Sequence, residues 1–140
     1  MRFLLDTNVV SEWVKLSPDI GVATWLAEID EEAVFLSVMT LGEIRHGIER
    51  LQAGARRSRL DTWVTTNLPL RFEGRILGID EATADVWGRL MALAQDRGRP
   101  MAAIDGFIAA TACRHGLNLV TRNVKDFEAL DIPLLNPWRA

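Results

Sequence analysis

Short, mostly apolar segments alternate along this chain with segments of helical periodicity. The apolar segments cover residues 2–5, 33–38, 75–79, 117–121 and, as a possible fifth, 133–135. Strands that are apolar on both sides are typical of a parallel sheet covered by helices on both faces. We therefore expect an α/β fold with three layers, α/β/α, around a central parallel sheet of about five strands. No linker rich in Pro, Gly or Ser divides the chain, so residues 1–140 are expected to form one domain.

Helices are expected between these strands, because apolar residues recur there at helical spacing and capping residues stand at the segment ends. The first two helices are expected to start at Asp6-Thr7 and near Pro18-Asp19. The next ones are expected from Thr40 to Gly54, over 56–68, from Asp80 to about Gln95, and over 102–115, where Gly116 ends the helix. A short turn or helix is expected around 125–130.

Acidic residues follow the predicted strands. Asp6 comes directly after the first strand, and Glu43 lies in the first turn of the helix after the second. Asp105 lies early in a helix that is apolar all round, where a buried carboxylate needs a metal ion, an arginine or a shifted pKa. Asn123 and Asp126 follow the fourth strand. Each residue also has a plainer explanation as a helix cap, a complement to the helix dipole or a turn former.

These acids are expected to converge, because the carboxyl ends of parallel strands lie at one edge of the sheet, where α/β folds bind ligands. Two unit charges about 4 Å apart repel by about 4 kcal/mol at an effective dielectric constant of 20. A divalent cation would remove that repulsion, and a set of oxygen ligands selects Mg²⁺ or Mn²⁺. Zinc is disfavoured, since His46, Cys113 and His115 show no paired-ligand spacing. A phosphate-binding Gly-rich loop and a serine nucleophile motif are also missing from the sequence.

The net charge of −3 argues against a sequence-independent nucleic-acid binder, which is usually basic. Basic residues nevertheless gather between Arg45 and Arg59, where they form either a basic rim around the acidic centre or a solvated helix face. The single cysteine and the lack of a signal peptide favour a cytoplasmic protein, and no apolar run is long enough to span a membrane.

Five stretches of the sequence resemble the PIN domain and, more narrowly, the VapC toxins of bacterial toxin–antitoxin pairs. They are residues 4–12 (LLDTNVVSE), 36–47 (LSVMTLGEIRHG), 103–112 (AIDGFIAATA), 121–123 with 126–127 (TRN and DF), and 135–138 (LNPW), the last of which is similar to the FitB-like branch. The resemblance spans essentially the whole chain, with the motifs in the order and spacing of the family.

The resemblance implies a PIN-domain fold and a Mg²⁺-dependent endoribonuclease, in which Mn²⁺ can substitute. The family's metal-site acids fall on Asp6, Glu43 and Asp105. The fourth acid falls within residues 121–127, where Asn123 stands at a position at which FitB-like members can carry Asp and Asp126 is the nearby acid. The resemblance gives supporting roles to Thr7, Asn8 and Thr121, and Arg45, Arg50 and Arg122 are candidates for contacts with RNA or a partner.

The resemblance also implies a homodimer and a cognate antitoxin similar to VapB or FitA. The antitoxin's C-terminal segment would wrap the toxin, and its N-terminal part would bind operator DNA. Three alternatives stand beside this interpretation: a PIN nuclease of RNA processing or repair that is not a toxin, a catalytically weak partner-binding subunit of an operator-binding complex, and a receiver domain. The last is disfavoured because Asp6 has no acidic neighbour. The RNA that is cut cannot be deduced from the sequence.

Overall fold

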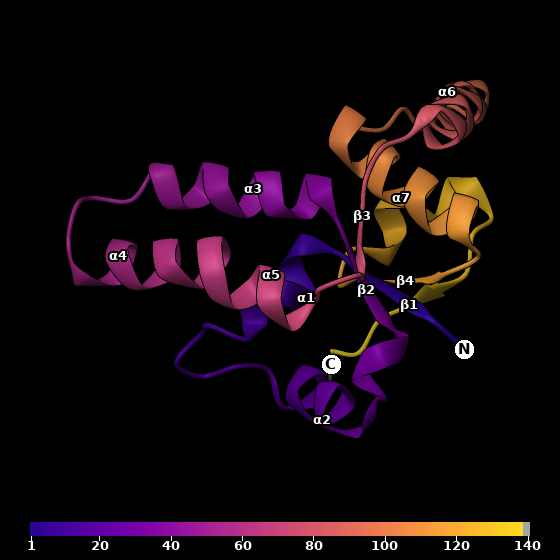
Figure 1. Cartoon of the computed structure of the whole chain (residues 1–140). Coiled ribbons are helices and arrows are strands. Elements are labelled where there is room, and N and C mark those ends of the chain that lie inside the picture. Colours follow the sequence, from indigo (N-terminus) through magenta and orange to yellow (C-terminus); the bar gives the residue numbers. More distant parts are fainter. Residues whose placement is uncertain (139–140) are drawn as a thin grey trace.

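A five-stranded sheet forms the centre of the computed structural model, which describes residues 1–138 (Figure 1). The strand order is β3-β2-β1-β4-β5, and every neighbouring pair is parallel. The strands are β1 (Phe3–Leu5), β2 (Val34–Ser37), β3 (Ile76–Leu77), β4 (Asn118–Val120) and β5 (Leu134–Leu135). The predicted sheet of about five parallel strands is therefore confirmed, although β3 and β5 are only two residues long each.

Helices connect the strands. They are α1 (Thr7–Glu12), α2 (Ile20–Glu28), α3 (Val38–Glu49), α4 (Ala55–Thr62), α5 (Leu68–Arg71), α6 (Glu81–Asp96) and α7 (Ala103–His115), with short helical segments η1 (Glu31–Ala33), η2 (Trp63–Asn67), η3 (Val124–Asp126) and η4 (Glu128–Leu130). Aspartates cap three of them as predicted, since carboxylates of Asp6, Asp19 and Asp80 accept hydrogen bonds from backbone N–H groups at the helix starts.

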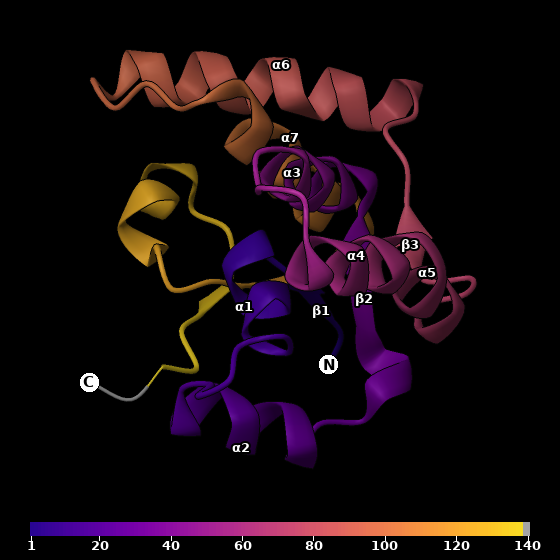
Figure 2. The ribbon, with the colours of Figure 1, turned by 90° about the vertical axis from the view of Figure 1, so that its left-hand side faces the viewer.

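Two apolar clusters cover the two faces of the sheet, as a three-layer fold requires. Successive side chains of a strand point to opposite faces. Phe3 and Leu5 therefore pack with residues of α1, α2, α3 and α5. Leu4 points the other way and packs with residues of α6, α7 and η4. Figure 2 shows this arrangement, with α6 and α7 on one side and α2 on the other.

The start of α3 differs from the prediction. Ser37, not Thr40, is the cap: its hydroxyl oxygen accepts a 3.1 Å hydrogen bond from the N–H of Met39. Thr40 lies inside the helix, fully buried, with no hydrogen-bond partner for its hydroxyl among residues 1–138. The prediction that Gly54 ends this helix is also wrong. The helix ends at Glu49, and Gly54 precedes α4 as its N-cap.

The single helix expected over 56–68 is interrupted by a wider turn. The N–H of Leu68 donates to the carbonyl oxygen of Trp63, five residues earlier, so η2 is a π-helix between α4 and α5. Pro69 follows directly and has no N–H with which to continue an α-helical ladder. Within residues 1–138, no helix is long and apolar enough to cross a membrane.

Candidate functional site

Asp6 stands where β1 ends, and its carboxylate is held by several donors. Oδ1 accepts a 2.8 Å hydrogen bond from the N–H of Thr7, and Oδ2 accepts one of 2.8 Å from the hydroxyl of Thr121, at the end of β4. The side-chain amide of Asn8 lies 3.4 Å from Oδ2 and 3.3 Å from Thr121 Oγ1. Asp6 is 5% exposed, and burial raises its pKa, while the bonds from Thr121 and Thr7 partly offset that rise. Asp6 is therefore both a helix cap and a fixed carboxylate at the sheet edge.

Glu43 reaches the same edge from α3. Its Oε1 accepts a 2.5 Å hydrogen bond from the hydroxyl of Thr7, the residue next to Asp6. The charge of Glu43 contributes to raising the pKa of Asp6. The first turn of α1 and the first half of α3 thus bring two carboxylates together, although 36 positions separate Thr7 from Glu43.

Asp105 lies in the first turn of α7, whose middle is buried, as the apolar sequence predicted. Its own side chain is half-buried. Burial, followed by the charges of Asp6, Glu43 and Asp126, raises its pKa from 3.8 to about 6. Of the three compensations considered from the sequence, the shifted pKa is present, and the charges responsible for part of it are those of the other candidate ligands.

Asp126, in η3, adds a fourth carboxylate. It is exposed, its charge raises the pKa values of both Asp6 and Asp105, and it lines a hollow of about 370 Å³ together with Asp105. Asn123 supports the loop through its backbone, since its N–H donates a 3.0 Å hydrogen bond to Thr121 Oγ1. Of the two candidates for the fourth position, Asp126 is the one whose charge reaches the other acids.

The four acids suit a hard divalent cation by charge and by ligand chemistry. All offer carboxylate oxygens, which Mg²⁺ and Mn²⁺ prefer. They come from four segments, and the charges of the neighbouring acids contribute to the raised pKa values of Asp6 and Asp105, so a cation between them would relieve a repulsion that the fold itself creates. Within residues 1–138, no three such side chains already meet as ligands of one ion. The four acids lie close enough for their charges to affect the pKa values of Asp6 and Asp105.

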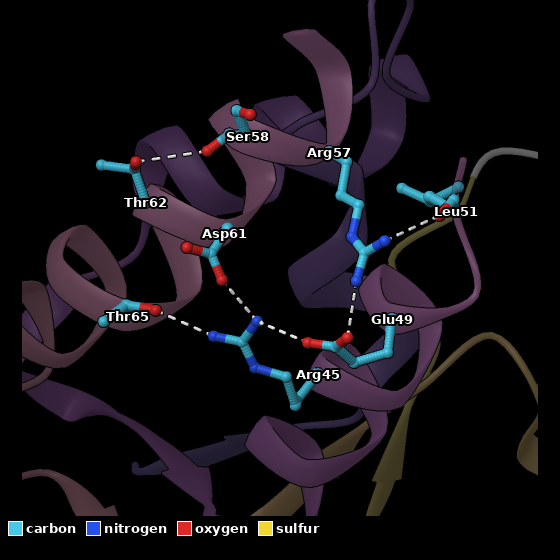
Figure 3. Close-up of polar contacts among 8 residues, drawn as sticks. All are labelled: Arg45, Glu49, Leu51, Arg57, Ser58, Asp61, Thr62 and Thr65. Carbon is cyan, nitrogen blue, oxygen red and sulfur yellow. Dashed lines mark hydrogen bonds and ion pairs between the residues drawn. The ribbon is translucent and has the colours of Figure 1, made fainter. Parts of the chain in front are cut away.

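Arg45, a candidate for RNA or partner contacts, forms ion pairs and a hydrogen bond within the fold. Figure 3 shows its guanidinium between α3 and α4, where Nη1 lies 2.5 Å from Asp61 and 3.4 Å from Glu49. Nη2 donates a 2.8 Å hydrogen bond to the hydroxyl of Thr65. Arg57 also pairs with Glu49, at 2.6 Å. Figure 1 shows these two helices running side by side away from the sheet, and this network joins them. A contact of Arg45 with RNA stays a prediction.

The other two candidate arginines are exposed. Arg50 caps the far end of α3. Arg122 lies near the acids in sequence, its N–H donating a 3.3 Å hydrogen bond to Asn8 Oδ1 and its guanidinium lying 5.7 Å from the ring centre of Trp138. Sequence reasoning named neither Arg99 nor Lys125, which line the hollow beside Asp105 and Asp126. The sequence could have indicated both residues, because Arg99 lies shortly before the helix that carries Asp105 and Lys125 lies directly before Asp126.

The fold and the site define a class: a parallel α/β protein whose carboxyl edge gathers carboxylates suited to a hard cation. The model of the PIN-domain family matches residues 3–133. This chain belongs to the PIN-domain family, and its fold is the PIN-domain fold that the sequence motifs indicated.

Similar proteins come from the toxin branch of that family. Toxin FitB of Neisseria gonorrhoeae is 38% identical over 135 residues, which is 96% of this chain and 97% of FitB. The VapC ribonuclease Y4jK of Sinorhizobium fredii is 36% identical over 96% of each chain. The crystal structure of FitAcB from Neisseria gonorrhoeae matches with a TM-score of 0.92 and 38% identity, covering 99% of both chains.

Proposed function

We propose that this protein is the toxin of a VapBC-type toxin–antitoxin pair and acts as a metal-dependent endoribonuclease. The observation that carries the proposal is the approach of four carboxylates at one sheet edge, where burial and then the charges of Asp6, Glu43 and Asp126 raise the pKa of Asp105 to about 6. Relatives with similarity over nearly the whole chain include Toxin FitB and a VapC ribonuclease, which supports the same activity here.

Asp6, Glu43 and Asp105 would hold Mg²⁺, with Mn²⁺ as a substitute, and Asp126 would complete the set. When bound, such an ion lowers the pKa of water and polarises a phosphoryl oxygen. The chain's own residues fix the geometry. Thr121 and the N–H of Thr7 orient Asp6, and the Thr7 hydroxyl orients Glu43. Asp105 and Asp126 border the hollow, where they would face an incoming phosphodiester. Asn8 links Asp6 to Thr121 and supports both.

The partners we propose follow the assemblies of the structural relatives. Similar solved structures include FitAB bound to a DNA fragment and VapBC2 of Rickettsia felis bound to a fragment of promoter DNA. We infer an antitoxin similar to FitA or VapB, a homodimer of this chain within the complex, and DNA contact through the antitoxin. Because cellular RNA is the substrate, we place the free toxin in the cytoplasm.

Cleavage of total RNA by the purified chain tests the activity. We expect cleavage with Mg²⁺ or Mn²⁺, none in EDTA, and loss of at least about a hundredfold in Asp6→Asn and Asp105→Asn, because each removes a ligand of the cation. Asp85→Asn is the matched control, since Asp85 lies exposed on α6 and pairs with Arg89 at 3.0 Å. If both site variants cut as fast as the parent, the nuclease assignment is wrong.

The toxin role needs a separate experiment in cells. Expression without a partner should stop growth, and sequencing of RNA ends after brief expression should show a recurrent cleavage site. A PIN nuclease of RNA processing would instead cut without arresting growth. Coexpression of a small DNA-binding protein encoded directly upstream should restore growth if the pair is a toxin and its antitoxin.

A further inference from the structure

Two basic side chains border the hollow beside the acids and are not used by the proposed metal site. Arg99 belongs to the loop between α6 and α7, and Lys125 belongs to η3. Together with Pro100, Met101 and Ala102 they line the hollow that also contains Asp105 and Asp126. Two segments separated by more than twenty residues therefore place cations and candidate ligands around one opening.

Arg99 joins the two segments. Its Nη2 donates a 2.5 Å hydrogen bond to the backbone carbonyl oxygen of Lys125, and its Nη1 lies 3.7 Å from Oε2 of Glu128. The first contact holds the backbone of η3 against the loop that leads into α7. This contact therefore fixes the position of the Lys125 backbone, from which the side chain extends directly beside Asp126.

Lys125 is available to a ligand, whereas many basic side chains are not. Carboxylates pair with the guanidinium groups of Arg45, Arg57, Arg71, Arg89 and Arg97. The ammonium group of Lys125 is on an exposed residue and forms no ion pair with any residue from 1 to 138. Because the ammonium group of Lys125 is not held in an ion pair with any residue from 1 to 138, it is free to contact an anion that arrives from outside.

We propose that Lys125, positioned by Arg99, binds the backbone phosphate adjacent to the one that is cleaved, so that the hollow is a substrate-binding subsite. The inference rests on the proposed nuclease function, since it takes RNA as the ligand. Four carboxylates repel a polyanion except at the phosphate that meets the metal ion. A cation beside them attracts the next phosphate and thereby holds the strand in register. The first turn of α7, which has no side-chain cap, adds positive potential on the same side.

Binding of single-stranded RNA without cleavage tests the role of Lys125. The probe is a fluorescein-labelled 12-nucleotide RNA in EDTA, with fluorescence anisotropy measured over a series of salt concentrations. Lys125→Gln should raise Kd by about tenfold, and the slope of log K against log salt should fall by about 0.7, as expected for one lost phosphate contact. Lys125→Glu should weaken binding further. If Lys125→Gln keeps the Kd and the salt slope of the parent, the inference is overturned.

Arg114→Gln and Arg114→Glu are the matched controls, because Arg114 is an exposed arginine in the last turn of α7, at the opposite end from Asp105. We expect them to leave the salt slope unchanged. If they change the slope as much as the Lys125 variants do, RNA binding follows net charge and the subsite is refuted.

Arg99 acts through Lys125, which a double mutant can show. Arg99→Gln should lower the salt slope in the parent but have little further effect in the Lys125→Gln background, and Arg99→Lys should recover part of the loss. A purely structural loss would lower the melting temperature without this dependence on Lys125. Full additivity of the two changes would overturn the positioning role.

The outcomes separate this inference from the function on which it rests. If the parent cuts RNA with Mg²⁺ but the Lys125 variants bind and cut like the parent, only the subsite fails. If the parent cuts no RNA with Mg²⁺ or Mn²⁺, the nuclease proposal fails, whatever the Lys125 variants do to binding.

Discussion

The hydroxyl of Thr7 donates a 2.5 Å hydrogen bond to Oε1 of Glu43 and so connects the start of α1 to α3 across the carboxyl edge of the sheet. The N–H of the same threonine donates to the carboxylate of Asp6 at 2.8 Å. One residue thus orients two of the proposed metal ligands, through its backbone and its side chain. A neutral donor between two carboxylates keeps them near each other when no cation is bound.

Replacing Thr7 with valine should weaken metal binding, because Val has the shape of Thr but cannot donate to Glu43. We expect the Mg²⁺ concentration for half-maximal cleavage to rise by about tenfold, while stability changes by only about 1 kcal/mol. Thr7→Ser keeps a hydroxyl and should resemble the parent. The measurement is a Mg²⁺ titration of cleavage, with thermal unfolding in EDTA as the check on folding. An unchanged half-maximal concentration in Thr7→Val would show that Thr7 does not position Glu43.

Asp105 should make stability fall as the pH rises when no divalent cation is present. Its pKa is about 6 in the folded protein and 3.8 ordinarily, so between these values the folded state binds more protons than the unfolded chain. Stability therefore decreases as pH rises through this window and stays lower above it. Asp105→Asn removes the ionised group and should raise the melting temperature in EDTA at pH 7.5, but not at pH 3.5.

The control for this pH effect is Asp85→Asn, which removes an exposed carboxylate of α6 that pairs with Arg89. Exposed ion pairs contribute little to stability, so we expect a small change that does not grow with pH. Equal melting temperatures for Asp105→Asn and the parent at pH 7.5 would show that Asp105 does not destabilise the fold when ionised.

Divalent cations should stabilise the folded protein, because they bind acids that gather only when the chain is folded. At a hundred times its Kd, a bound ion adds about 2.7 kcal/mol, which is roughly 6–12 °C in melting temperature for a domain of this size. The shift should disappear in Asp6→Asn, which keeps a capping side chain while it removes the charge. Thermal unfolding with and without Mg²⁺ measures it, and the same shift in both proteins would place the ion elsewhere.

A side chain at Gly106, next to Asp105, is expected to destabilise the fold. A Cβ there would lie 2.5 Å from Met91 Sδ and 2.9 Å from Trp87 Nε1, since α6 packs closely on α7. Gly106→Ala should therefore lower the unfolding free energy by about 1–3 kcal/mol. The control is Gly88→Ala on α6, where a Cβ would meet nothing within 4 Å and should stabilise the helix by up to about 1 kcal/mol.

A second change sharpens the Gly106 prediction. Met91→Ala removes the closest atom and should recover part of the stability lost in Gly106→Ala, which chemical denaturation can measure. If Gly106→Ala is as stable as Gly88→Ala, the contact between α6 and α7 is looser than the structure indicates.

Much of the fold could be predicted from residues that act within their own segment. Continuous apolar runs are typical of strands buried on both faces, and the aspartate caps Asp6, Asp19 and Asp80 act on N–H groups within three residues. The boundaries of α3 and the π-turn at Trp63–Asn67 could not be predicted in this way. Ser37 and Thr40 are both good caps. Because β2 ends at Ser37 and α3 begins at the next residue, Ser37 becomes the cap.

The sequence by itself determined which residues are acidic and that Asp6, Glu43, Asp105 and Asp126 follow strands or begin helices near one edge. The tertiary structure decided which distant residues hold them in place: Thr121 bonds to Asp6 across 115 positions, Thr7 bonds to Glu43, and Arg99 bonds to the backbone of Lys125 beside Asp126. The physical reason is the distance along the sequence over which each kind of interaction acts. Caps and periodicity act over a few residues, whereas contacts between distant segments depend on strand order and on how α3 and α7 pack beside the sheet.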